Sequence, residues 1–176
     1  PRGGGVWGRK SISCTLTACY NTGAVEATGD YFGGVGGENY SSSTLTSSYN
    51  TGGVTGTSRV GGVCGYNGFQ ATITSSYNTG AVTGSYNVGG VSGTNDNSTL
   101  TSSYNTGAVT GTDGVGGVFG WNNYNSTLTS SYNPGGVTGT APGAGGCGDD
   151  DYQATHSSTY PLTVVTVTAR VGSVCC

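Results

Sequence analysis

Short runs of valine, threonine, leucine and tyrosine alternate along this chain with clusters of glycine, asparagine and serine. Residues 44–49 illustrate the runs, because an alternating pattern there puts Leu45 and Tyr49 on one face of an extended segment. Thr44 and Thr46 fall on the opposite face. We expect the leucine face to point into a core and the threonine face to point outward. No segment has the period of about 3.6 residues that marks an amphipathic helix, so the sequence predicts an all-β fold.

The dipeptide Tyr-Asn recurs at residues 20, 49, 77, 104 and 132, and subtraction gives successive offsets of 29, 28, 27 and 28 residues. A nearly fixed period in this range is the signature of a repeat architecture. Each unit holds three segments rich in β-branched or aromatic residues, separated by turn-forming clusters, and this predicts three strands per coil. The sequence therefore predicts a β-solenoid (β-helix) of about five coils of roughly 28 residues, in which each coil buries its apolar side against its neighbours.

Equivalent positions of successive units should stack into ladders along the solenoid. The expected core ladders are Leu16, Leu45, Ile73, Leu100 and Leu128, together with Val54, Val82, Val109 and Val137. The asparagine of Tyr-Asn recurs at a predicted turn, and its amide is expected to stack coil upon coil as in cross-β ladders. This turn ladder comprises Asn21, Asn50, Asn78, Asn105 and Asn133.

Three segments follow from the extent of the repeat. Residues 1–13 are expected to form an N-terminal cap or arm, residues 14–146 the solenoid, and residues 147–176 a C-terminal cap or strand-exchange segment. The tail alternates apolar and polar residues from Val165 onward, which predicts an extra C-terminal strand outside the repeat. That strand either caps its own stack or adds to the next subunit. Because uncovered strand edges template further chains, the expected partners are copies of the chain itself in a head-to-tail homopolymer.

The amino-acid composition argues against several classes of function. The 176 residues include 36 glycines, only 7% are charged, and the net charge is −3. Such a chain offers no basic patch for nucleic acid and no apolar run long enough for membrane insertion. No cofactor or metal site is expected. The single histidine, His156, lies outside any nucleophile-elbow motif, so the sequence does not predict an enzyme.

The six cysteines favour disulfides in an oxidising, extracellular or cell-surface location over a metal site. Cys14 and Cys19 cannot bond each other if the segment between them is extended, because it would span roughly 17 Å and a disulfide needs about 4.4–6.8 Å between Cα atoms. Spacing alone selects no pairing. The disulfide candidates are Cys14, Cys19, Cys64, Cys147, Cys175 and Cys176.

The segment Val-Gly-Gly-Val-x-Gly recurs at residues 60–65, 88–93 and 115–120, each time beside a Ser-Tyr-Asn segment. These units resemble GLUG-motif repeats, the glycine-rich repeats of bacterial surface proteins and adhesins. The resemblance covers roughly residues 14–146. It implies a cell-surface architecture without a defined reaction, and it transfers no catalytic residue.

The pattern favours an extracellular structural protein, a self-assembling filament or surface-fibre subunit with an adhesive role. One alternative is an ice-binding β-solenoid, because Thr-x-Thr recurs once per unit and should form two outward columns. A second threonine array, including Thr55 and Thr110, instead indicates that threonine is the favoured outward strand residue. The candidate face comprises Thr15, Thr17, Thr44, Thr46, Thr72, Thr74, Thr99, Thr101, Thr127 and Thr129.

A second alternative is a carbohydrate-binding surface module that contacts surface glycans. Its candidate aromatic strip is Tyr40, Tyr66, Trp121 and Tyr124, although packing of the loop turns is the simpler role for these rings. Acceptor motifs for N-glycosylation begin at Asn39, Asn97 and Asn125, which are expected to occupy the same variable loop of their coils.

Overall fold

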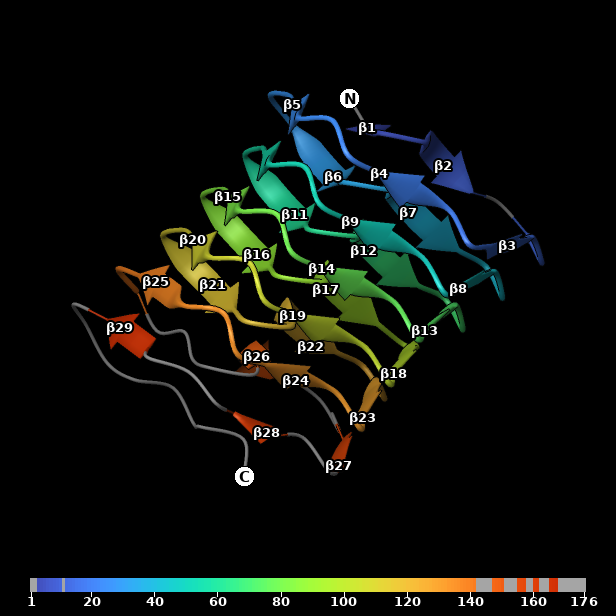
Figure 1. Cartoon of the computed structure of the whole chain (residues 1–176). Helices are drawn as coiled ribbons and strands as arrows, with labels where there is room; N and C mark the ends of the chain where they lie inside the picture. Colours follow the sequence, from blue (N-terminus) through green and yellow to red (C-terminus); the bar gives the residue numbers. More distant parts are fainter. Residues whose placement is uncertain are drawn as a thin grey trace.

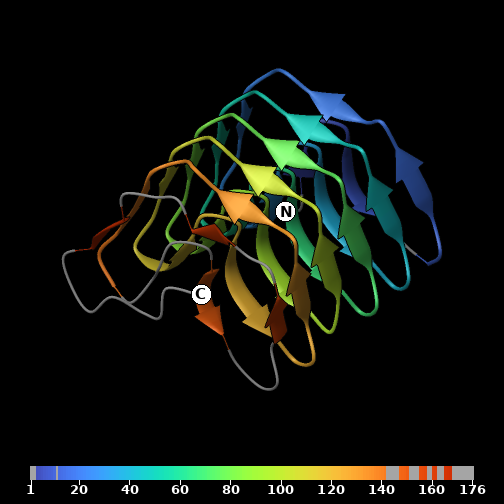
Figure 2. The ribbon, with the colours of Figure 1, turned by 60° about the horizontal axis from the view of Figure 1, so that its bottom comes forward.

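The computed structural model describes residues 3–10, 12–141, 147–150, 155–157, 160–161 and 165–167. Within these residues every regular element is a β-strand, and the strands stack in parallel, coil upon coil, into a β-solenoid (Figure 1). Successive coils follow the same path around a common interior (Figure 2). The predicted β-solenoid of about five coils is confirmed.

Each coil contributes one short strand to each of five parallel sheets, here named A to E. Sheet A contains β1 (Gly3–Gly4), β6 (Asp30–Gly33), β11 (Ser58–Gly61), β16 (Tyr86–Gly89) and β21 (Asp113–Gly116). Sheet B contains β2 (Trp7–Lys10), β7 (Gly36–Tyr40), β12 (Cys64–Gly68), β17 (Ser92–Asp96), β22 (Phe119–Asn123) and β26 (Cys147–Asp150). Sheet C contains β3 (Thr15–Thr17), β8 (Thr44–Thr46), β13 (Thr72–Thr74), β18 (Thr99–Thr101), β23 (Thr127–Thr129) and β27 (Thr155–Ser157).

The two remaining sheets hold the shortest strands. Sheet D contains β4 (Tyr20–Asn21), β9 (Tyr49–Asn50), β14 (Tyr77–Asn78), β19 (Tyr104–Asn105), β24 (Tyr132–Asn133) and β28 (Tyr160–Pro161). Sheet E contains β5 (Val25–Glu26), β10 (Val54–Thr55), β15 (Val82–Thr83), β20 (Val109–Thr110), β25 (Val137–Gly139) and β29 (Val165–Val167). The first coil is therefore β1–β5 and the fifth is β21–β25. The strands β26–β29 add part of a sixth turn to sheets B to E.

The expectation of three strands per coil is wrong, because two of the three runs are each divided into two strands. One run is divided at the Gly-Gly corner between sheets A and B, and the other bends at an internal residue in the left-handed region. In the second coil this residue is Ser47, with φ 51°, and the equivalent residues of other coils have φ between 49° and 56°. The bend separates sheet C from sheet D and reverses the alternation that follows it. Ser48 consequently turns inward and is fully buried, whereas Tyr49 lies outside with its ring stacked on a neighbour. Tyr49 therefore does not share the face of Leu45.

Two apolar clusters fill the interior. The first contains the leucine ladder, with Leu45, Ile73, Leu100 and Leu128 at 0% exposure and Leu16 half-buried beside it. The second contains Val54, Val82, Val109 and Val137, each at most 2% exposed. Strand pairing holds both ladders in strict register, coil to coil.

The strands of both chain ends extend the same stack. The residues expected to form an N-terminal cap or arm supply β1 and β2, which pair with β6 and β7. In the tail, β29 pairs with β25 of its own chain, with Val137 opposite Val165. The described part of the extra C-terminal strand thus caps its own solenoid.

Candidate functional surfaces

The asparagine of each Tyr-Asn dipeptide points into the solenoid rather than lying in an exposed turn. Asn50, Asn78, Asn105 and Asn133 are fully buried, and Asn21 of the first coil is half-buried. Each side-chain Nδ2 donates to the Oδ1 of the next asparagine at 2.7–2.8 Å. Each Nδ2 also donates to the carbonyl oxygen of the glycine two residues later. The predicted amide ladder is therefore a continuous, buried hydrogen-bond chain that satisfies otherwise costly polar groups.

The two most frequent sequence motifs meet at this ladder. A Cβ added at Gly62, in the Val-Gly-Gly-Val corner between sheets A and B, would collide with the amide of Asn78. It would also collide with the carbonyl oxygen of Gly90 in the next coil. Glycine is needed here because the backbone of one wall approaches the side chain of the opposite wall. The Gly-Gly corner and the Tyr-Asn dipeptide thus form one interior contact in each coil.

A second buried asparagine ladder runs along the end of sheet B. Asn39, Asn67 and Asn95 each donate from Nδ2 to the next Oδ1 in turn, ending on Asn122, at 2.8–3.0 Å. In the sequence an asparagine recurs two residues after the last glycine of Val-Gly-Gly-Val-x-Gly, and this recurrence is the signal that marks the ladder. In the first coil, Lys10 takes the position in register with Asn39.

The expectation that the three glycosylation motifs occupy the same variable loop is wrong for Asn39, which lies in β7. Its side chain is fully buried in the second ladder, where the acceptor amide already bonds to Asn67. Asn97 and Asn125 are exposed and lie in the corner between sheets B and C. Glycosylation at these two residues stays a prediction.

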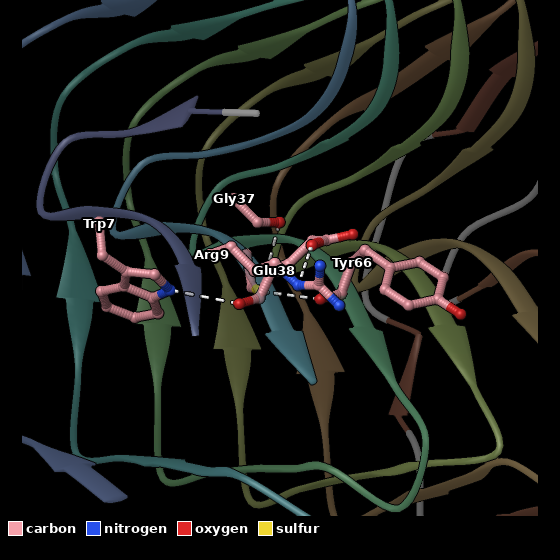
Figure 3. Close-up of polar contacts among 6 residues, drawn as sticks. Trp7, Arg9, Gly37, Glu38 and Tyr66 are labelled. Atoms are coloured by element: carbon pink, nitrogen blue, oxygen red, sulfur yellow. Dashed lines mark hydrogen bonds and ion pairs between the residues drawn. The ribbon is translucent and has the colours of Figure 1, made fainter. Parts of the chain in front are cut away.

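Polar contacts on sheet B join residues of the first three coils (Figure 3). The Arg9 Nε lies 3.1 Å from Glu38 Oε2, and the indole Nε1 of Trp7 donates to the Glu38 carbonyl oxygen at 3.4 Å. The Tyr66 hydroxyl donates to Asp96 Oδ2 at 2.6 Å, and burial raises the pKa of Tyr66. These contacts fasten neighbouring coils to one another, and Tyr66 is too buried to belong to an exposed aromatic strip.

Lys10 closes the second ladder at the first coil. Its side chain is only 4% exposed, and its Nζ donates to the carbonyl oxygen of Thr44. Burial lowers the pKa of Lys10, because the ammonium has lost most of its hydration. The carbonyl ends of the ladder amides point toward this coil, so a positive charge here complements their dipoles.

The cysteines of the described residues are free thiols. Cys64 is buried, and its Sγ donates to the Tyr66 carbonyl oxygen at 3.3 Å, so the expected disulfide at this residue is wrong. Burial raises the pKa of Cys64 to about 12. Cys14 is exposed and Cys19 half-buried at the first coil. The side chain of Cys147 in β26, together with Cys175 and Cys176, lies outside the described residues.

The outer face of sheets C and D carries hydroxyl groups without charge. Its threonines form two columns in register across five coils, from Thr15 to Thr127 and from Thr17 to Thr129. Beside them, the rings of Tyr20, Tyr49, Tyr77, Tyr104 and Tyr132 stack with centroids 5.0–5.3 Å apart and planes within 11°. No lysine, arginine, aspartate or glutamate occurs in any strand of either sheet. Aligned side chains of one kind make this a periodic, neutral surface.

Two classes of site have no counterpart in the part of the chain that the structure describes. No group of three or more His, Cys, Asp or Glu side chains is placed to hold a metal ion there. No helix in the described ranges is long and apolar enough to cross a membrane.

These features define a tandem-repeat protein of the parallel β-solenoid class. The family model of the GLUG motif matches residues 56–83, which contain all five strands of the third coil, β11–β15. This match confirms the resemblance and is consistent with a GLUG-repeat protein. No curated protein and no solved structure matches the chain.

Proposed function

We propose that this repeat protein is a non-catalytic structural module of the cell exterior that assembles head-to-tail with copies of itself. One observation carries the proposal: the first coil leaves uncovered the interior positions that every other complete coil buries. Cys14 is exposed, and Leu16, Cys19 and Asn21 are half-buried, whereas their counterparts in the next four coils are at most 4% exposed.

The backbone of the first coil also has an unpaired edge. Strands β1–β5 each form the edge of their sheet, so one row of their amide and carbonyl groups has no strand partner among the described residues. Ile12 is 76% exposed and Val6 is 49% exposed at the same coil. A further coil would cover both the apolar groups and the strand edges, which are templates for strand addition.

A second copy of the chain is the partner that fits this end, because every coil presents the same five-strand outline at the same register. The opposite end carries β26–β29 on four sheets, so the two ends differ. A contact between unlike ends is heterologous and does not close, which yields a filament. This end-to-end contact also supports an adhesive role by repeating the outer surfaces at intervals along a fibre.

Sedimentation and negative-stain electron microscopy test this assembly. The full chain should form linear oligomers that grow with concentration, and Leu16→Asp should abolish them because it places a charge in the contact. Tyr86→Asp is the matched control, since Tyr86 is 53% exposed on the side of the solenoid and should leave assembly unchanged. Monomers at every concentration, or oligomers that persist in Leu16→Asp, would contradict the proposal.

The neutral face of sheets C and D favours ice binding as a second candidate function. Two threonine columns in register present methyl and hydroxyl groups at a regular spacing, with no charged strand residue beside them. This function predicts thermal hysteresis in the full chain, and Thr101→Tyr should abolish it by interrupting one column. Absence of hysteresis in the unmodified chain would exclude this function.

A further inference from the structure

The corner between sheets B and C differs in length among coils that otherwise match. Between the second and fifth coils, every other connection keeps its number of residues. Residues 69–71 join β12 to β13 in the third coil, whereas only residues 97–98 join β17 to β18 in the fourth. The corner of the fourth coil therefore has one residue in the left-handed region, Asn97. The corner of the third coil has two, Phe69 and Gln70. The shorter turn leaves room beside the longer turns before it.

A hollow of about 270 Å³ occupies this corner, lined by Ser41, Ser42, Phe69, Gln70 and Asn97. Coil-to-coil backbone hydrogen bonds hold its walls, because Ser42 N donates to Phe69 O at 2.9 Å and Gln70 N to Asn97 O at 2.7 Å. The hollow is therefore preorganised, and a ligand would lose little affinity to ordering the turns.

Phe69 supplies an apolar wall. Its ring is 49% exposed, although it packs against Tyr40 with ring centroids 4.5 Å apart. The contact with Tyr40 fixes the ring, while about half of the side chain stays open to solvent. A fixed, half-open aromatic ring presents a flat surface for the C–H groups of a ligand.

The other walls are polar and neutral. Ser41, Ser42, Gln70 and Asn97 make no side-chain hydrogen bond to another described residue, so two hydroxyl groups and two amides remain available. An amide offers both a donor and an acceptor, which matches a pair of adjacent hydroxyl groups on a ligand. No charged residue lines the hollow.

We propose that this corner hollow binds one ring of a neutral saccharide chain. A pyranose ring combines the required features, since it has an apolar C–H face, adjacent hydroxyl groups and no charge. The volume lies just below the range of about 300–1,000 Å³ typical of small-molecule sites, which fits one ring rather than a longer segment. The site goes beyond the end-to-end assembly and does not depend on it.

A nuclear magnetic resonance titration of the ¹⁵N-labelled full chain tests the site. The probes are the neutral hexasaccharides of cellulose, chitin and mannan, each at up to about 10 mM, well above a dissociation constant of about 1 mM. At least one should shift the amide signals of residues 41–42, 69–70 and 97 in a saturable way. Phe69→Ala and Gln70→Ala should each weaken that binding roughly tenfold or more, a loss of about 1.4 kcal/mol. Phe69→Trp should restore it.

Tyr86→Ala is the matched control, because Tyr86 is as exposed as Phe69 but lies on sheet A outside the hollow. Its affinity should equal that of the unmodified chain. Three results would overturn the proposal: no saturable shift with any of the three hexasaccharides, shifts that leave the five lining residues unmoved, or equal affinity in Phe69→Ala. A glycan found on Asn97 of the native chain by mass spectrometry would also overturn it, since that glycan would fill the hollow.

Discussion

Replacing Asn105 in the middle of the first asparagine ladder should be strongly destabilising. Asn105→Ala removes four hydrogen bonds: from Asn78 at 2.7 Å, to Asn133 at 2.8 Å, to Gly107 O at 2.7 Å, and from Gly107 N at 3.2 Å. Asn78 and Asn133 each keep another hydrogen-bond partner, so the groups left unpaired are mainly the backbone N–H and C=O of Gly107. Two buried groups left unpaired at about 1–3 kcal/mol each, together with the cavity, give a cost of about 3–5 kcal/mol.

The isosteric change Asn105→Asp separates hydrogen bonding from shape. An ionised carboxylate still accepts from Asn78, but it places an oxygen where the amide donated to Asn133 and Gly107. Burial and this repulsion should raise the folded-state pKa of the new carboxyl above its ordinary value of about 3.9. Well below about pH 3.9 the group is protonated in both states and the variant is at its most stable, although its one O–H replaces only one of the two donated hydrogen bonds. Stability should then fall as pH rises toward the folded pKa, because only the unfolded chain has released the proton.

Thermal and chemical unfolding followed by circular dichroism measure both effects. At pH 7 a loss of about 3–5 kcal/mol corresponds to a melting shift of roughly 6–20 °C for a chain of this size. Thr106→Ala is the matched control, since Thr106 is exposed beside Asn105, does not lie in the left-handed region, and should change stability by less than about 0.5 kcal/mol. Two results would contradict the role of the ladder in stability. One is an Asn105→Ala variant that melts within 2 °C of the unmodified chain, as a variant at an exposed site would. The other is an Asn105→Asp variant that gains stability from pH 4 to pH 7.

Three further predictions concern other interior positions. Gly62→Ala should destabilise the chain by several times the cost of Gly53→Ala, whose Cβ would meet no atom closer than the Ala81 carbonyl oxygen at 4.0 Å, as denaturant titration of both variants would show. Burial lowers the pKa of Lys10 from 10.5 in the folded chain. The free energy of unfolding should therefore rise as pH climbs from the lowered pKa toward 10.5. Lys10→Met should remove that rise in unfolding experiments across this range. A thiol reagent should label Cys14 in the folded chain and leave Cys64 unmodified until denaturant is added, which peptide mass spectrometry resolves; equal labelling rates would contradict the burial of Cys64.

The period and the apolar ladders were predictable from the sequence because stacking requires the same residue at the same place in every coil. Leu45 and Val54 recur with their neighbours at one spacing, and each is buried as a ladder member. The number of strands per coil was not predictable in this way. Ser47 adopts a left-handed conformation although serine seldom does so, and nothing in the local sequence marks the bend. A single unrecognised bend then moves Ser48 inward and Tyr49 outward.

The polar interior was the harder feature to recognise, since buried asparagine runs against composition rules. Asn78 is tolerated because the equivalent residue of each neighbouring coil supplies the missing partner, and Asn67 follows the same logic in the second ladder. A single repeat read alone shows an unpaired amide, whereas the stack shows a satisfied one. The role of a polar residue in a solenoid is therefore a property of its column rather than of its local sequence.

Whether a residue belongs to a stacked column also decides whether its position stabilises the fold or is free to vary. The leucine, valine and asparagine columns and the glycine corners repeat nearly unchanged from coil to coil, because one deviation breaks two contacts. The leading residues of the corner between sheets B and C escape this restraint, since most of their side chains are exposed and their backbone groups make the bonds from coil to coil. Successive coils place Ser41-Ser42, Phe69-Gln70, Asn97 and Tyr124-Asn125 there. A solenoid that repeats its leucine, valine and asparagine columns can still change its length and chemistry at such a corner, and the neutral hollow lies at the corner whose length differs among the described coils.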